Sequence, residues 1–288
     1  MIYNSIITKN RQYLRPQING KTNFMIFQQN IRGITHKTEE LSFSLSEINP
    51  QVFCIAETHL RPEEINLINL GQYTLGAQYC RWHFRQGGVS IFTLNNIVFD
   101  VIDLNQFCRE KDFEICALKI QLMSTYLLVL CIYRSTDLEI YRSPSGDFSY
   151  FLTQLEIVLN KLYKISVNII LCGDFNVNFS DSTSRAPVLE SLLHSFYLES
   201  IVEFPTSFMP TSQTIIYNIF LDKKTLKSQV YPHINGISDH DAQLIILLDL
   251  TYYFSKSPSL CRRVIDDYSV QKFIELLSHE SWEVCIFK

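Results

Sequence analysis

The chain is dominated by short apolar runs separated by polar and turn-forming residues. Runs of this length are typical of β-strands, whereas apolar residues at every third or fourth position are typical of helices. Strands are predicted at residues 23–28, 51–56, 72–80, 88–94, 97–103, 112–121, 125–132, 167–172, 213–221, 228–232 and 241–249. Helices are predicted from Thr38, a candidate N-cap, to Asn49, and at residues 147–164 and 184–195.

The predicted strands outnumber the predicted helices by about three to one, which limits how the sheets can be connected. A regular βαβ repeat needs a helix between most strands, and this chain has too few helices for that. We therefore predict an α/β (α+β) fold, in which two packed mixed sheets are flanked by helices.

The pattern of strand-like apolar runs is weaker at both ends of the chain. Residues 1–22 are polar and are predicted to form a loose leader before a domain that spans residues 23–250. Residues 251–288 begin as a polar, turn-rich segment and end in a short amphipathic helix, whose apolar stripe is Val270, Phe273, Ile274 and Leu277. This tail is expected to be a linker to a domain that is absent here, and the alternative is a terminal helix that docks back onto the domain.

Composition narrows the class of protein. Of the 288 residues 47% are hydrophobic and 19% are charged, which favours a packed core over a disordered chain. The net charge of −4 gives no global positive field, so a nucleic acid would have to meet a local basic strip or a metal. The candidates for that strip are Arg32, Arg81, Arg85 and Arg134.

The eight cysteines form no CxxC pair and mostly lie in apolar runs, so buried free thiols in a reducing compartment are expected. The first 20 residues lack the apolar core of a signal peptide, and no apolar stretch reaches the roughly 18 residues that span a bilayer. We expect a soluble, intracellular protein without a membrane partner.

Four polar segments each border one of the apolar runs. They are QQN around Asn30, AETHL around Glu57, GDFN around Asp174, and SDHD with His240 at its third position. Side chains from different strand ends can meet only if those ends lie at one edge of a sheet. Carboxylates, amides and an imidazole gathered there would form an oxygen-rich site for a metal and a phosphate.

Each segment alone has an ordinary structural explanation. G-D-x-N is often a turn, a Glu at a strand end is often solvated, and an isolated Asp-His pair is often structural. The chemistry is plausible nevertheless: Gly173 lets the backbone turn, Asp174 can take a proton from water, and Asn176 can donate to a phosphate oxygen. Asp239 could complete a metal shell.

Taken together, the order N…E…GDxN…SDH resembles the endonuclease/exonuclease/phosphatase family, whose fold is like that of DNase I, from about Asn23 to Leu250. Further segments resemble the endonuclease domain of non-LTR (LINE-type) retrotransposons: ETHL, RQGGVSIF at 85–92, CIYRS at 131–135, LCGDFNVNF, FPTS at 204–207 and ISDHDAQ. The resemblance implies a four-layer α/β/β/α sandwich. It also implies a DNA endonuclease that depends on Mg²⁺, with Mn²⁺ as an alternative, and nicks target duplex to leave a 3′-hydroxyl primer.

The resemblance also implies a reverse transcriptase downstream, contact with retroelement RNA through it, and action in the nucleus. It assigns roles to ten residues of this sequence. The catalytic group is Asp174, Asn176, His240 and Tyr133, the metal ligands are Glu57, Asn30 and Asp239, and the substrate contacts are Arg134, Thr206 and Ser238.

One position departs from the family pattern. Related domains carry an Asp in a segment like TIIDNIF, where it holds the catalytic His, and this chain reads TIIYNIF with Tyr217 in its place. A neutral phenol cannot orient and charge-stabilise His240 as a carboxylate does, so reduced or lost activity is expected. Asp222 and Asp241 lie nearby in sequence. The alternative functions are a catalytically degenerate remnant, and an apurinic endonuclease or phosphatase of the same fold.

Overall fold

The computed structural model describes residues 7–8, 17–18, 22–122, 125–135, 148–163, 168–181, 185–209, 212–254 and 267–279. Residues 1–256 form one compact unit, and residues 257–288 form a second. The described part of the second unit contains the helix α4 (Asp267–Ser278), at the predicted amphipathic segment. The predicted linker falls largely outside the described residues.

The first sheet of the larger unit has six strands. Their order is β15 (Ser228–His233), β16 (Ala242–Leu250), β3 (Thr22–Asn30), β4 (Val52–Ala56), β6 (Val89–Leu94) and β5 (Tyr73–Tyr79). β3 and β4 are parallel and are joined by the helix α1 (Thr38–Ile48), whereas the other neighbours are antiparallel. All five residues of β4 are buried, which explains why its sequence is a continuous apolar run rather than an alternating one.

The second sheet has seven strands in the described part of the chain. Their order is β1 (Ile7–Thr8), β7 (Phe99–Ile102), β8 (Glu114–Gln121), β9 (Tyr126–Tyr133), β10 (Asn168–Asp174), β14 (Tyr217–Leu221) and β11 (Glu199–Ser200). β9 and β10 are parallel, with the helix α2 (Phe148–Tyr163) between them in the chain. Smaller elements are α3 (Ala186–His194), the pairs β12 (Ser207–Met209) with β13 (Ser212–Thr214) and β2 (Gln17–Ile18) with β17 (Tyr253–Phe254), and the 3₁₀ turns η2 (Ile65–Leu67) and η3 (Asn105–Phe107).

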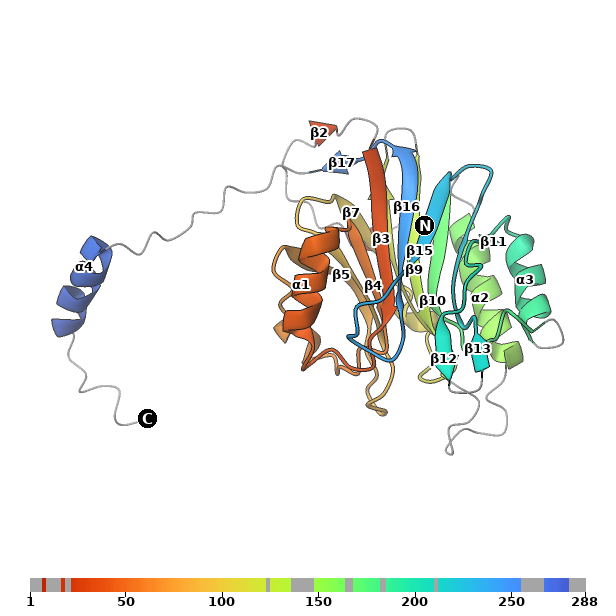
Figure 1. The fold of residues 1–288 in the computed structure, drawn as a ribbon, viewed down its shortest axis with the longest axis horizontal. Coiled ribbons are helices and arrows are strands. Elements are labelled where there is room, and N and C mark those ends of the chain that lie inside the picture. The colour runs from red at the N-terminus through yellow and green to blue at the C-terminus, as the bar shows by residue number, and fades with distance from the viewer. Residues whose placement is uncertain are drawn as a thin grey trace. The chain divides into compact units, whose positions relative to one another are not determined.

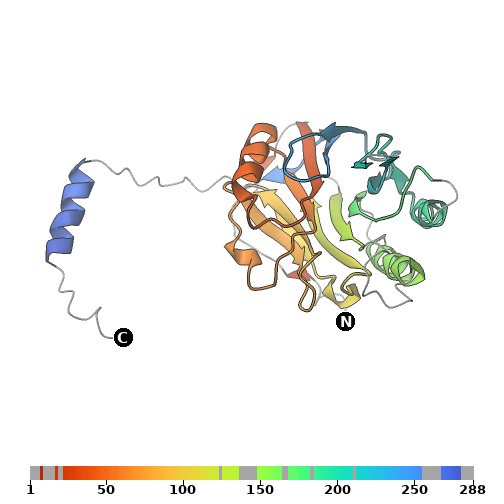
Figure 2. The same cartoon turned by 60° about the horizontal axis from the view of Figure 1, so that its bottom comes forward.

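Three apolar clusters show how the layers stack. One lies between the two sheets and includes Ile26, Val52 and Ile170. A second joins α2 and α3 to the seven-stranded sheet, and a third joins α1 to the six-stranded sheet. Figures 1 and 2 show the resulting order of helix, sheet, sheet and helices in this unit. The predicted four-layer α/β/β/α sandwich is confirmed.

Several sequence predictions need adjustment. Thr38 is the first residue of α1 rather than its N-cap, which is Lys37 and makes no side-chain cap. The run 213–221 divides into β13 and β14, and the predicted leader contains two short strands, β1 and β2, which pair with β7 and β17. Of the six cysteines in the described ranges, all are free thiols and only Cys108 is not fully buried. No helix of the described residues is long and apolar enough to cross a membrane.

Candidate active site

The strand directions bring the four polar segments to one edge of the sandwich. β3 and β4 run parallel and end at Asn30 and next to Glu57, and β9 and β10 run parallel and end at Tyr133 and Asp174. β14 is antiparallel to β10, so its first residue, Tyr217, pairs with Asp174. The segment before β16 returns to the same edge. The motifs therefore converge as predicted, but at one edge of the sandwich, with contributions from both sheets rather than from one.

The side chain of Asn30 links the two sheets. Its Nδ2 donates to Glu57 Oε1 at 2.8 Å and to Asp174 Oδ2 at 2.9 Å. Since both carboxylate oxygens contact one nitrogen, they lie less than about 6 Å apart, within reach of a single hydrated divalent cation. Asn30 Oδ1 instead accepts the backbone N–H of Arg32 at 3.1 Å, so the amide bridges the carboxylates as a donor.

Burial and repulsion act on these carboxylates. Burial raises the pKa of Asp174 well above its usual value, and the nearby Glu57 charge raises it further, although Asn30 and the Asn176 N–H donate to it. Burial also raises the pKa of Glu57, but hydrogen bonds from His59 and Asn30 outweigh that effect and hold it below its usual value. A cation would stabilise this pair of close carboxylates, one of which resists ionisation beside the other.

His59 is a contact that the sequence argument missed. Its Nε2 lies 3.1 Å from Glu57 Oε2 and fixes the carboxylate from the side opposite Asn30. Its signal was present in the tripeptide ETH, which places it two residues after Glu57.

The backbone at these strand ends is strained. Arg32, Glu57, His59 and Asn176 have φ of 45°, 54°, 57° and 47°, in the left-handed region that residues other than Gly seldom adopt. Such conformations persist where surrounding structure holds them, and they cluster at functional sites. Gly173 lies within β10 at a φ of 144°, and no larger residue fits there because a Cβ would lie 2.0 Å from Ile132 O.

Asn176 is half-buried and its amide is held in place. Asn176 Nδ2 donates to Arg134 O at 2.5 Å, and its N–H donates to Asp174 Oδ1 at 3.0 Å. Arg134, predicted to contact DNA, is buried: its Nη1 donates to Asn176 O at 3.3 Å and its guanidinium lies 5.4 Å from the Phe148 ring. Arg134 therefore supports the Asn176 turn from within the protein.

His240 is nearly buried beside Tyr217. Their ring centroids are 4.9 Å apart with the rings at 65°, an edge-on packing. His240 Nδ1 is buried and has no hydrogen-bond partner among the described residues. Burial lowers the pKa of His240, whereas it raises that of the Tyr217 phenol, as do the charges of Asp174 and Glu57. The imidazole thus lacks the acidic partner that the family pattern would supply.

Asp222, close to Tyr217 in sequence, and Asp241, close to His240, do not replace that partner. Asp222 follows the opposite end of β14 and caps a turn through the Lys224 N–H. Asp241 is adjacent to His240, but no hydrogen bond joins the two side chains within the described chain. Ser238 holds the loop that contains His240. Its Oγ donates to Asn30 O at 2.7 Å and accepts the His240 N–H at 3.2 Å.

Asp239, predicted as a metal ligand, is engaged by Arg32 and lies next to His240. Its carboxylate pairs with Arg32, and its side chain is 55% exposed. Its Oδ1 lies 3.5 Å from His240 Nε2. In the described residues, no three His, Cys, Asp or Glu side chains form a closed metal cluster. The donor set brought together is therefore Glu57, Asp174 and Asn30, with Asp239 at the rim.

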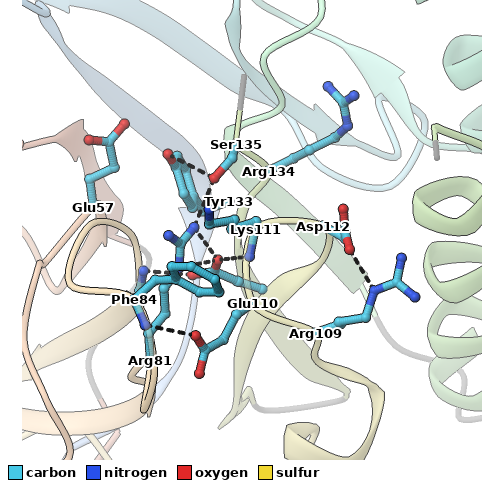
Figure 3. Close-up of polar contacts among 12 residues, drawn as sticks. Glu57, Arg81, Phe84, Arg109, Glu110, Lys111, Asp112, Tyr133, Arg134 and Ser135 are labelled. Carbon is cyan, nitrogen blue, oxygen red and sulfur yellow. Dashed lines mark hydrogen bonds and ion pairs between the residues drawn. The ribbon is translucent and has the colours of Figure 1, made fainter. Parts of the chain in front are cut away.

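Tyr133 is held by a buried network that includes a contact with Ser135 (Figure 3). Burial raises its pKa, as do the charges of Glu57 and Asp174, so the phenol remains a neutral donor. Ser135 Oγ, 3.5 Å from Tyr133 Oη, also accepts from Arg81 Nη2 at 2.8 Å. Arg81, predicted to face DNA, is only 2% exposed and pairs with Glu114 at 2.5 Å.

Hydrogen bonds also connect the Arg81–Glu114 ion pair to the segment that contains Glu57. Glu114 Oε2 accepts the Gly88 N–H at 2.6 Å, and Gly88 O accepts the Thr58 N–H at 3.3 Å. Gly87 leaves room for the guanidinium, since a Cβ there would lie 2.2 Å from Arg81 Cζ. Glu114 and Arg81 are thus residues that position the site, and neither is part of a polar motif in the sequence.

Thr206, predicted to bind substrate, is buried. Its Oγ1 accepts the N–H groups of Ile216 and Tyr217 at 3.0 and 3.1 Å. The Thr206 hydroxyl oxygen therefore hydrogen-bonds to the backbone at the start of β14.

Comparison with known proteins supports the same arrangement. Residues 136–244 match the model of the family described as endonuclease-reverse transcriptase. The endonuclease domain of TRAS1, a telomere-specific non-LTR retrotransposon, is 16% identical, with a TM-score of 0.56 over 78% of this chain and 98% of that domain. The chain has the DNase I-like fold of the endonuclease/exonuclease/phosphatase family.

Other solved structures with this fold include AP endonucleases. That from Leishmania major has 12% identity and a TM-score of 0.64, over 78% of this chain and 88% of its own. That from Archaeoglobus fulgidus has 14% identity and a TM-score of 0.58, over 78% and 99%. A comparison with curated proteins finds no match. The family match includes Asp174, Asn176 and His240 but begins after Glu57 and Tyr133.

Proposed function

We propose that this domain is a metal-dependent phosphodiesterase that nicks DNA and leaves a 3′-hydroxyl end. The observation that supports it most is the bridge from Asn30 to Glu57 and Asp174, beside Asn176, Tyr133 and His240. Carboxylates, amides and an imidazole at this spacing suit hydrolysis of a phosphate ester. The family match to an endonuclease-reverse transcriptase points to DNA as the substrate.

Glu57 and Asp174 are the residues that fit a divalent cation such as Mg²⁺ or Mn²⁺. Their carboxylates are close and buried, and the raised pKa of Asp174 marks the charge that a cation would offset. When bound, the metal would supply positive charge for the leaving 3′ oxygen. Asn30 and Asp239 would contribute from the sides of this pair.

The chain's own side chains carry the proton transfers and hold the phosphate. The Asp174 carboxylate takes a proton from the attacking water, whose oxygen bonds to phosphorus as the bond to the 3′ oxygen breaks. Asn176 has a second amide hydrogen beyond the one given to Arg134, and that hydrogen is available for a non-bridging oxygen. His240 Nε2 and the Tyr133 phenol supply two more donors.

Because Tyr217 stands where a carboxylate would support His240, we expect slow catalysis. His240 Nδ1 has no acceptor in the described structure, and the adjacent group is a neutral phenol. Within the described residues, the imidazolium form therefore has no acceptor at Nδ1, and its acidic neighbour is Asp239, 3.5 Å from Nε2 at the rim of the site.

A panel of substrates tests the proposal. The full chain with Mg²⁺ should nick supercoiled plasmid and leave ends that a DNA polymerase extends. Faster cleavage of a duplex with one abasic site would favour the apurinic alternative. Release of inorganic phosphate from an inositol phosphate, without nicking, would refute the proposal.

A further inference from the structure

A groove beside the carboxylates concentrates positive charge in a chain whose net charge is −4. It has a volume of about 430 Å³, and its lining includes Arg32, Lys37, Arg61 and Arg85 but only one carboxylate, Glu64. His59, which contacts Glu57, also lines it, so the groove opens next to the candidate active site.

The four cations differ in how they are used. Arg32 pairs with Asp239, and Lys37 Nζ donates to Ile31 O at 2.6 Å. The guanidinium groups of Arg61 and Arg85 make no ion pair within the described ranges, so both charges are available to a ligand.

Arg85 also ends an exposed aromatic loop, residues 82–85. Trp82 is 66% exposed and Phe84 45%, so two aromatic side chains lie at the surface in the same loop as Arg85. The loop is held from below by Glu110, whose carboxylate accepts the N–H groups of Trp82, His83 and Phe84. Figure 3 shows Phe84 and Glu110 on the Tyr133 side of the site.

A loop fixed in this way displays its aromatic rings with little entropy left to lose on binding. Lys111 Nζ lies 3.7 Å from the Phe84 ring centroid and adds a further positive charge at its base. Arginines beside exposed aromatic side chains suit DNA better than an acidic peptide, because the arginines can contact phosphates and an aromatic side chain can insert at a base step and stack on the base it unstacks.

We propose that the groove and loop form one DNA-binding surface that holds the duplex beside the scissile phosphate. Arg61 and Arg85 contact backbone phosphates in the groove, and Trp82 stacks on a base at the edge of the contact. This inference rests on the proposed function for its choice of DNA, and it assigns the contacts to particular residues of this chain.

Anisotropy of a fluorescein-labelled duplex tests the phosphate contacts. Titrations of the full chain in EDTA at several salt concentrations give the slope of log affinity against log salt. Arg61→Ala and Arg85→Ala should each reduce that slope by about 1 and weaken binding to all sequences alike. Lys227→Ala is the control, because this exposed lysine precedes β15 at the opposite edge of the sheet. A slope in both arginine variants equal to that of the control would overturn the inference.

Fluorescence tests the stacking. The chain has two tryptophans, so Trp282→Phe leaves Trp82 as the sole tryptophan emitter. DNA should quench its emission in EDTA, and unquenched emission at saturating DNA would refute the stacking contact. Because neither assay needs catalysis, groove-dependent binding without nicking would contradict only the proposed function. Nicking whose salt dependence is the same in the native chain and in the Arg61 and Arg85 variants would contradict only this inference.

Discussion

Replacing Tyr217 with Asp should restore a partner to His240 and accelerate nicking. Tyr217 is 1% exposed, pairs with Asp174 across β10 and β14, and packs 4.9 Å from the His240 ring. The buried Nδ1 of that ring lacks an acceptor among the described residues. A carboxylate at this position could accept its hydrogen and stabilise the imidazolium, as an orienting Asp does in other His-dependent sites.

Two opposing magnitudes set the expected result. Gain of an orienting carboxylate is worth about 10²- to 10⁴-fold in rate, or about 3 to 5 kcal/mol in activation free energy. Loss of a buried aromatic ring costs about 3 to 5 kcal/mol of folding stability. A third carboxylate near Asp174 and Glu57 adds repulsion, so we expect the variant to need Mg²⁺ for full stability.

The assay compares initial rates of plasmid nicking for the native chain, Tyr217→Asp and Tyr217→Phe. Circular dichroism with and without Mg²⁺ establishes that each variant is folded at the assay temperature. Tyr217→Phe keeps the ring and removes the hydroxyl, so it should stay as slow as the native chain. If the native chain already nicks at the rate of a folded Tyr217→Asp variant, another group supports His240 and the reasoning fails.

Two further predictions concern stability. Glu114→Ala should leave the Arg81 charge buried without its carboxylate partner and lower the free energy of unfolding in urea by about 3 to 5 kcal/mol. The control, Glu156→Ala at an exposed position, should change that free energy by less than about 0.5 kcal/mol. Equal effects of the two substitutions would contradict the role of the Arg81–Glu114 pair. In EDTA, the raised pKa of Asp174 should make the free energy of unfolding fall as pH rises from about 3.9 through that raised value, because the folded state retains a proton that the unfolded chain has lost. Burial is the larger cause of the raised pKa and the Glu57 charge the second, so Glu57→Gln should shorten the pH range over which stability falls, and an unchanged range would show that the Glu57 charge does not contribute.

Much of the fold and the central cluster could be predicted from sequence. Strands buried on both faces give continuous apolar runs, and parallel strands such as β3 and β4 must end at one edge. That rule places Asn30 next to Glu57, whereas Asp174 ends β10 in the other sheet, and its place beside them was predicted from the family resemblance.

The supporting contacts could not be predicted, because they depend on pairing between distant segments. Arg81 and Arg134 looked like basic surface residues, but Glu114 lies 33 positions from Arg81 and the Phe148 ring belongs to another element. The exposure of Trp82 and Phe84 could not be predicted either, because aromatic residues are usually assigned to a core. The pairing of Asp239 with Arg32 also needed coordinates.

The most direct test of the central claim is nicking of supercoiled plasmid in Mg²⁺ and in EDTA by the native chain, Tyr217→Asp, Asp174→Ala and Asp222→Ala. Asp222 is the matched control, since it caps a turn at the far end of β14. We predict Mg²⁺-dependent nicking that is slow in the native chain and in Asp222→Ala, faster in Tyr217→Asp and absent in Asp174→Ala. Nicking that persists in EDTA or in Asp174→Ala, or its absence from both the native chain and a folded Tyr217→Asp variant, would contradict the claim.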